Sequence, residues 1–198
     1  MRWLVALLAV SFLIPVSAEA VVLVRRPYLQ MTTDSATTLV WRTDVSTTGE
    51  VQYGTDPSDL SSSVQSPVED PNHAVRITGL EPDTTYYYAV FSAGQLLASP
   101  AETDARQTPL HRFTTHPEVG SSRAFRAWVL GDSGTGSLRQ LQVADAMLNR
   151  VGADRPDLFI HLGDMAYGDG SDDEFTTRFF GPYADILTNT PIWPTMGN

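Results

Sequence analysis

The chain contains neither cysteine nor lysine. Without cysteine it has no disulfide, thiolate nucleophile, cysteine-ligated zinc or iron–sulfur cluster. Any metal must be held by oxygen or imidazole ligands, which suit harder cations. All 13 basic residues are arginine, and 23 acidic residues bring the formal net charge to −10. This acidic balance argues against non-specific nucleic-acid binding, which needs a basic face, so we expect no nucleic-acid partner.

The chain also lacks an apolar run long enough to span a bilayer, which takes about 20 residues. The longest candidate, Trp3 to Pro15, follows Arg2 and precedes Ala18-Glu19-Ala20, whose small residues suit a signal-peptidase site. Residues 1–20 are therefore predicted to be a signal peptide, and the protein to be secreted or periplasmic with no membrane span after cleavage. An uncleaved N-terminal anchor is the alternative.

Short β-forming runs fill residues 21–117. They lie at 37–43, 50–54, 74–77, 85–91 and 112–115 and are separated by turn residues, which is typical of a β-sandwich. Within Leu80–Tyr88, a tyrosine just inside a strand can return its hydroxyl to the upstream backbone as a tyrosine corner. We expect Tyr86 to form this corner and Trp41 to fill the core. An aromatic ligand platform is the alternative interpretation of these residues.

Three histidines, His73, His111 and His116, flank strands or lie at the end of this region, and we expect them to be solvated loop residues rather than ligands. Residues 118–124 contain glycine and serine and are predicted to be a linker between two domains.

The periodicity changes after the linker. Strand-like runs at 125–130, 157–162 and 191–196 alternate with a helical pattern at 137–151 and an acidic-starting helix from Asp172 to about Leu187. This order predicts a parallel α/β layer with right-handed crossovers. His161, at a strand end, is predicted to be a packed structural residue, and 169–174 a solvated loop and helix start.

Each predicted strand of this layer ends in a glycine followed by a polar residue. These pairs are Gly131-Asp132, Gly163-Asp164 and Gly197-Asn198. The carboxyl ends of parallel strands share one edge of a sheet, so we expect Asp132, Asp164 and Asn198 to converge in one crevice. Two carboxylates and an amide oxygen without a nearby counter-charge favour a cation between them.

These motifs resemble known families. Arg26-Pro27-Tyr28-Leu29-Gln30, Val51-Gln52-Tyr53-Gly54 and Leu80–Tyr88 look like the N-terminal, fibronectin type III-like domain of purple acid phosphatases. Gly131-Asp132-x-Gly134, Gly163-Asp164-x-x-Tyr167 and Gly197-Asn198 look like the first three blocks of calcineurin-like metallophosphoesterases, in the purple acid phosphatase version.

The resemblance implies a multidomain fold. An all-β immunoglobulin/fibronectin III-like sandwich at 21–117 would precede the linker at 118–124. The first βαβαβ part of an α/β metallophosphoesterase domain would occupy residues 125–198.

The resemblance also implies a secreted acid phosphatase that hydrolyses phosphate monoesters at two metal ions, Fe(III) and a divalent ion (Zn, Mn or Fe). Asp132 would bind the first metal, Asp164 would bridge both, Tyr167 would donate a phenolate to Fe(III), and Asn198 would bind the divalent ion. The family's catalytic histidines belong to later blocks, which have no counterpart here, so the chain is expected to be a C-terminally truncated member with little or no activity.

Two other functions stay open at this point. The first is an exported binding or adhesion module whose β-sandwich is the functional part and whose α/β segment is vestigial. The second is a phosphodiesterase or nucleotidase of the same superfamily. The oligomeric state is not predicted.

Overall fold

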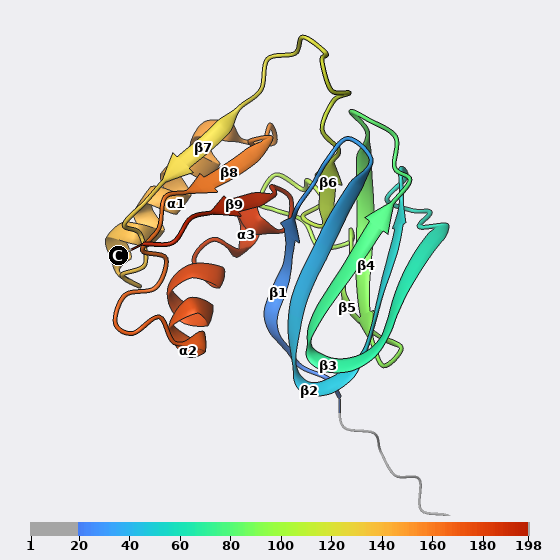
Figure 1. Ribbon diagram of the computed structural model, residues 1–198, viewed down its shortest axis with the longest axis horizontal. Coiled ribbons are helices and arrows are strands. Elements are labelled where there is room, and N and C mark those ends of the chain that lie inside the picture. The colour runs from blue at the N-terminus through green and yellow to red at the C-terminus, as the bar shows by residue number, and fades with distance from the viewer. Residues whose placement is uncertain (1–19, 198) are drawn as a thin grey trace, which may run out of the picture.

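The computed structural model describes residues 20–197, so the predicted signal peptide up to Glu19 and the predicted ligand Asn198 lie outside the described residues. A β-sandwich from β1 (Leu23–Gln30) to β6 (Arg112–Thr114) packs beside an α/β part from β7 (Ala127–Leu130) to β9 (Ile192–Pro194) (Figure 1). The predicted fold class is confirmed. In residues 20–197, no helix combines the length and hydrophobicity needed to cross a membrane.

Two long strands organise the sandwich. β2 (Ala36–Gly54) pairs antiparallel with β3 (Ser62–Thr78) along most of its length. Its first half also pairs with β1 and its second half with β4 (Thr85–Ser92), and the β2–β3 register shifts between Arg42 and Gly49. The expectation of separate strands at 37–43 and 50–54 was wrong, because the backbone continues through the shift as one strand. The sequence analysis also missed β1 and β5 (Gln95–Ala98).

The sandwich core confirms two predicted roles. Trp41 is 1% exposed, and its indole Nε1 donates to the Ser92 hydroxyl at 3.1 Å. The hydroxyl of Tyr86 accepts a hydrogen bond from the Glu81 backbone N–H at 3.0 Å, which is the expected tyrosine corner. Trp41 is therefore a core residue and not part of an exposed platform.

The histidine prediction was wrong for His73 and His111, which are both buried. The His73 ring stacks on Trp41 at 4.8 Å, and its Nε2 lies 2.9 Å from the Thr43 hydroxyl. His111 packs edge-on against Tyr88 and lies 3.3 Å from a Glu102 carboxylate oxygen. Burial lowers the pKa of His73 and of the half-buried His116. The sequence pattern shows strand ends, but only the folded chain shows that neighbouring segments cover them.

The α/β part has the predicted parallel order β7–β8–β9, with β8 at Leu158–His161. Helix α1 (Leu138–Val151) begins after its N-cap Ser137 and is followed by Gly152, whose φ is +63°. The predicted second helix consists of α2 (Asp172–Phe175), a π-helical turn η1 (Thr176–Phe180) and α3 (Ala184–Leu187).

An aromatic core joins the two parts of the molecule. Phe159, Phe179 and Tyr183 are buried together, and Tyr28 of the sandwich belongs to the same cluster. The Tyr88 hydroxyl, buried in the sandwich, donates to the Thr188 carbonyl of the α/β part at 2.7 Å. The sandwich keeps a core of its own around Trp41, and the second cluster extends across the interface to Tyr28 on β1.

The opposite face of the small sheet is apolar and open. Val129 and Trp193 are 52% and 46% exposed, and both lie in register with Ile160. Leu138 and Leu141, near the start of α1, are 70% and 42% exposed. Gln140, between them in sequence, is buried and hydrogen-bonds to the Arg178 carbonyl, so another side of this end of the helix is the covered one.

Replacing Tyr86 with Phe tests the tyrosine corner. The variant leaves the Glu81 N–H without its acceptor, so the free energy of unfolding should fall by about 1 kcal/mol. Urea unfolding measures this change. Tyr87→Phe on the same strand is the matched control, since no hydrogen bond of its hydroxyl is seen in the part of the chain that the structure describes. If Tyr86→Phe and Tyr87→Phe have the same free energy of unfolding, the hydrogen bond of the tyrosine corner does not stabilise the fold.

Candidate metal centre

The two predicted aspartates each follow the end of a parallel strand in a strained backbone conformation. Asp132 has φ +52° and Asp164 has φ +58°. Left-handed backbone is uncommon outside glycine, although aspartate tolerates it better than most residues, and such strain concentrates at functional sites. Gly163 has a positive φ, but in the first loop Asp132 itself takes the left-handed position and Gly131 does not.

Backbone hydrogen bonds join the two aspartate loops. The Asp132 N–H donates to the Gly163 carbonyl at 3.2 Å, and the Gly134 N–H donates to the Asp164 carbonyl at 2.9 Å. The Tyr167 N–H returns to the Gly134 carbonyl at 2.8 Å. A side chain at position 134 would overlap the backbone of Met165 and Ala166, so only glycine allows this approach.

The Tyr167 hydroxyl lies between the two carboxylates. It is 2.9 Å from Asp132 Oδ1 and 3.0 Å from Asp164 Oδ2. A phenol has one proton, so it can donate fully to only one carboxylate at a time. Hydrogen bonding to Asp132, a smaller effect of burial and hydrogen bonding to Asp164 raise the pKa of Tyr167 well above its usual value. Two negative groups thus share one proton at the edge of the sheet.

The end of the third strand reaches the same point. The Thr195 N–H donates to the His161 carbonyl at 2.8 Å and carries the chain past the end of β8. Gly197 lies so close to Asp164 that a side chain there would overlap the Asp164 carboxylate. The structure therefore brings Asp132, Asp164 and Tyr167 together, with the residue before Asn198 beside them.

His161 is buried beneath the two aspartate loops and hydrogen-bonds to each of them. Its ring is fully buried, Nδ1 accepts from the Gly163 N–H at 3.3 Å, and Nε2 lies 2.7 Å from the Ser133 hydroxyl. Because Nδ1 is an acceptor, we assign the ring proton to Nε2, which donates to Ser133. Burial lowers the pKa of His161, in keeping with a neutral ring. The predicted structural role is confirmed, and the ring links both aspartate loops.

Sequence analysis missed the residues that hold the tyrosine loop. Arg178 donates to the Tyr167 carbonyl, and the Glu174 carboxylate accepts from the Asp169 and Ser171 N–H groups at 3.0 and 3.1 Å. Ser171 and Glu174 form a capping box at the start of α2. The Ser-x-x-Glu spacing was an available signal for the box. Nothing in the sequence pointed to Arg178.

The donor set suits a hard cation. Two carboxylates and a phenol offer oxygen ligands, which Fe(III), Mn and Mg prefer. Across residues 20–197, no three His, Asp or Glu side chains gather as a metal site would require. The described part thus provides two carboxylates and one phenol, fewer ligands than two metal ions need.

A cleft of about 680 Å³ lies elsewhere, between the two parts of the chain. Arg112, His116, Arg155 and Asp157 are among the residues that line it. The cleft adjoins Leu158 and Pro191, where β8 and β9 begin, whereas the aspartates follow the strand ends. The chemistry of the aspartate site therefore does not extend into this cleft.

Comparisons with known proteins bear on the fold of this chain. The family described as "Purple acid Phosphatase, N-terminal domain" matches residues 24–115. The purple acid phosphatase PPD1 from yellow lupin (Lupinus luteus) seeds superposes with a TM-score of 0.65 at 18% identity, over 87% of this chain and 34% of that one. PhoD superposes with a TM-score of 0.58 at 13% identity, over 86% of this chain and 38% of that one.

Both superpositions show likeness of fold, and the chain spans just over a third of the length of each neighbour. No curated protein sequence matches the chain.

The Tyr167 contacts predict an abnormal alkaline titration. Both carboxylates favour the neutral phenol, so in metal-free protein Tyr167 should stay protonated well above the usual pKa of about 10. The stabilisation is present below pH about 10 and is lost as pH rises towards the raised pKa. Absorbance at the phenolate wavelength, wild type minus Tyr167→Phe, should show no ionisation near pH 10. A difference step near pH 10 would mean that the hydroxyl is free of the carboxylates.

Proposed function

Because residues 24–115 match the family described as the purple acid phosphatase N-terminal domain, we propose that this chain contributes to a metal-dependent acid phosphatase acting on phosphate monoesters. One observation carries the proposal. The Tyr167 hydroxyl lies 2.9 and 3.0 Å from the carboxylates of Asp132 and Asp164, at the ends of adjacent parallel strands. This edge is where α/β sheets bind their ligands.

The proposed roles are those that the resemblance to purple acid phosphatases implies. Asp132 would hold one metal ion, and Asp164, with two carboxylate oxygens, would hold both ions. Tyr167 would bind Fe(III) through its phenol oxygen, and Asn198 would contribute its amide oxygen to a divalent ion such as Zn, Mn or Fe. The metal ions, when bound, polarise the phosphate and supply the nucleophile from water. The chain's own part is to hold these oxygens in place, with His161 fixing both loops from below.

We further propose that residues 1–198 alone turn over little or no substrate. The described residues contribute two carboxylates and a phenol, and a two-metal site needs more ligands than these with Asn198 added. The adhesion-module alternative receives less support, because one face of the sandwich is committed to the α/β part through Tyr28 and Tyr88.

Metal loading tests the proposal. The purified chain, loaded with Fe(III), should develop a visible charge-transfer absorption that Tyr167→Phe abolishes and Asp132→Asn weakens. Tyr87→Phe is the control, since that tyrosine lies in the sandwich. Chromogenic phosphate monoester and diester turnover, with Fe(III) and Zn supplied, should not exceed that of the metal salts. Absence of the band in the wild type contradicts the metal assignment, and fast turnover contradicts the inactivity. Preferential diester hydrolysis would favour the phosphodiesterase alternative.

Export is proposed from residues 1–20. Intact-mass measurement of the protein recovered from the periplasm or medium should give a chain that begins near Val21. A mass that still includes Met1 would exclude cleavage and favour an N-terminal anchor.

A further inference from the structure

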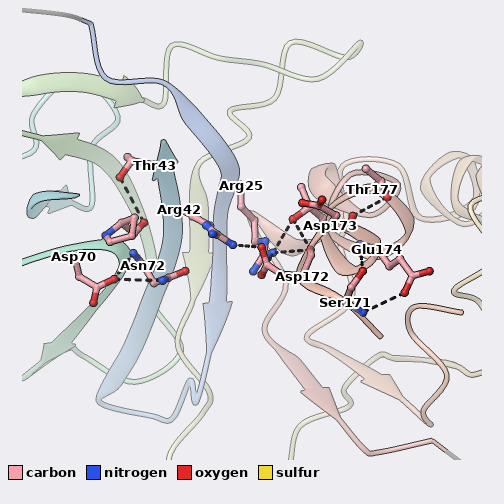
Figure 2. Close-up of polar contacts among 12 residues, drawn as sticks. Arg25, Arg42, Thr43, Asp70, Asn72, Ser171, Asp172, Asp173, Glu174 and Thr177 are labelled. Carbon is pink, nitrogen blue, oxygen red and sulfur yellow. Dashed lines mark hydrogen bonds and ion pairs between the residues drawn. The ribbon is translucent and has the colours of Figure 1, made fainter. Parts of the chain in front are cut away.

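Two arginines of the sandwich meet one carboxylate of the α/β part. Arg25 on β1 and Arg42 on β2 are direct cross-strand partners. Like charges in such positions repel each other. Here Asp172, the first residue of α2, lies between them: its Oδ1 is 3.0 Å from Arg25 Nη2, and its Oδ2 accepts from Arg42 (Figure 2). The arginine pair is therefore matched to an acidic group from the other part of the chain.

Arg25 makes further contacts with the same helical segment. Its side chain is 10% exposed, and its Nη2 donates to the Thr176 hydroxyl at 2.7 Å. The guanidinium carbon lies 4.1 Å from the centre of the Phe180 ring, at the end of η1. These contacts hold both ends of α2–η1 against the sandwich. The guanidinium of Arg25 holds the pKa of Asp172 below its usual range, so Asp172 is charged at neutral pH.

The other side of α2–η1 holds the loop of Tyr167. Glu174 accepts from the Asp169 and Ser171 N–H groups, and a side chain at Gly168 would overlap its carboxylate. Arg178 lies 3.3 Å from Glu174 and donates to the Tyr167 carbonyl. The segment from Tyr167 to Ser171 thus packs around the carboxylate of Glu174 on α2 and hydrogen-bonds to it.

The first aspartate loop is attached to the same segment. The buried Gln140 donates from Nε2 to the Arg178 carbonyl at 2.5 Å and accepts from the Gly136 N–H at 2.7 Å. The π-helical turn places Arg178 between the two loops, and such turns are frequent at functional sites.

We infer that Arg25 and Arg42 are positioning residues for the metal centre: through Asp172 they fix the helical segment α2–η1, whose Glu174 and Arg178 hold the Tyr167 loop. The sandwich then contributes to the metal centre without providing a ligand. This inference rests on the proposed function for its consequence in metal binding, but the positioning itself is measurable in metal-free protein.

The first test uses Arg42→Gln, because Arg42 contacts Asp172 and is not part of the buried core. Hydrogen exchange of the Asp169 and Ser171 amides, measured in metal-free protein, should accelerate about tenfold, as should exchange in Asp172→Asn. The double variant should be no worse than Asp172→Asn alone, since Asp172→Asn already removes the ion pair with Arg42 as well as the one with Arg25. The NMR chemical shifts of the Tyr167 ring should also change in Arg42→Gln, in Asp172→Asn and in the double variant.

Arg26→Gln is the matched control. Arg26 is adjacent on β1 and also bridges the two parts, but it pairs with Asp185 at 2.9 Å on α3. Arg26→Gln should weaken the interface between the two parts about as much as Arg42→Gln does. It should nevertheless change the hydrogen-exchange rates of the Asp169 and Ser171 amides less than about twofold. If Arg26→Gln and Arg42→Gln accelerate exchange equally, the effect is general loosening and the inference is wrong. Unchanged exchange and ring shifts in folded Arg42→Gln also overturn it.

Metal binding gives the second readout. If the wild type binds Fe(III), Arg42→Gln should weaken binding about tenfold and alter the charge-transfer absorption, whereas Arg26→Gln should do neither. If the wild type shows no such absorption, the proposed function fails, but amide exchange and ring shifts still decide the positioning. The two failures are thus distinguishable.

Discussion

The metal centre depends on two carboxylates that the fold holds close enough to share one proton. Asp132 and Asp164 lie within hydrogen-bond distance of the same Tyr167 hydroxyl. Two carboxylates that close repel each other unless a proton or cation lies between them. Both aspartates also hold left-handed backbone, and backbone hydrogen bonds, Gly134 and His161 keep the two loops in this arrangement. The surrounding fold thus maintains a local configuration that is unfavourable alone, which is the usual condition of a ligand site.

The two parts of the chain act as one packed body. Tyr28 enters the aromatic core of the α/β part, and the Tyr88 hydroxyl is satisfied by the Thr188 carbonyl. Around this apolar centre lie ion pairs of differing exposure. Arg155 and Asp104 are 3.1 Å apart and nearly buried, whereas Asp172 is 55% exposed beside Arg25. Apolar burial provides most of the association, and the ion pairs set its register, because partly exposed pairs contribute little net free energy.

The sequence predicted the fold class and the site loops better than the strand boundaries. Alternation and turn residues indicated a sandwich, and the change to helical periodicity indicated the parallel layer. Local patterns could not show that β2 runs unbroken from Ala36 to Gly54, because the shift in its pairing depends on β3. They also misjudged His73 and His111, whose burial comes from segments distant in sequence. Asn198 stays a prediction.

By itself, the sequence determined the chemistry that is available: oxygen ligands without thiolates, and Gly-Asp pairs that follow buried strands. It also determined the tyrosine corner and the cap of α1, because those contacts join residues only a few positions apart. Tertiary structure alone decided that one hydroxyl meets both aspartates, and that Arg25 and Arg42 meet Asp172 across 147 and 130 residues. Such contacts depend on how strands and helices pack in three dimensions, and no local periodicity encodes that packing.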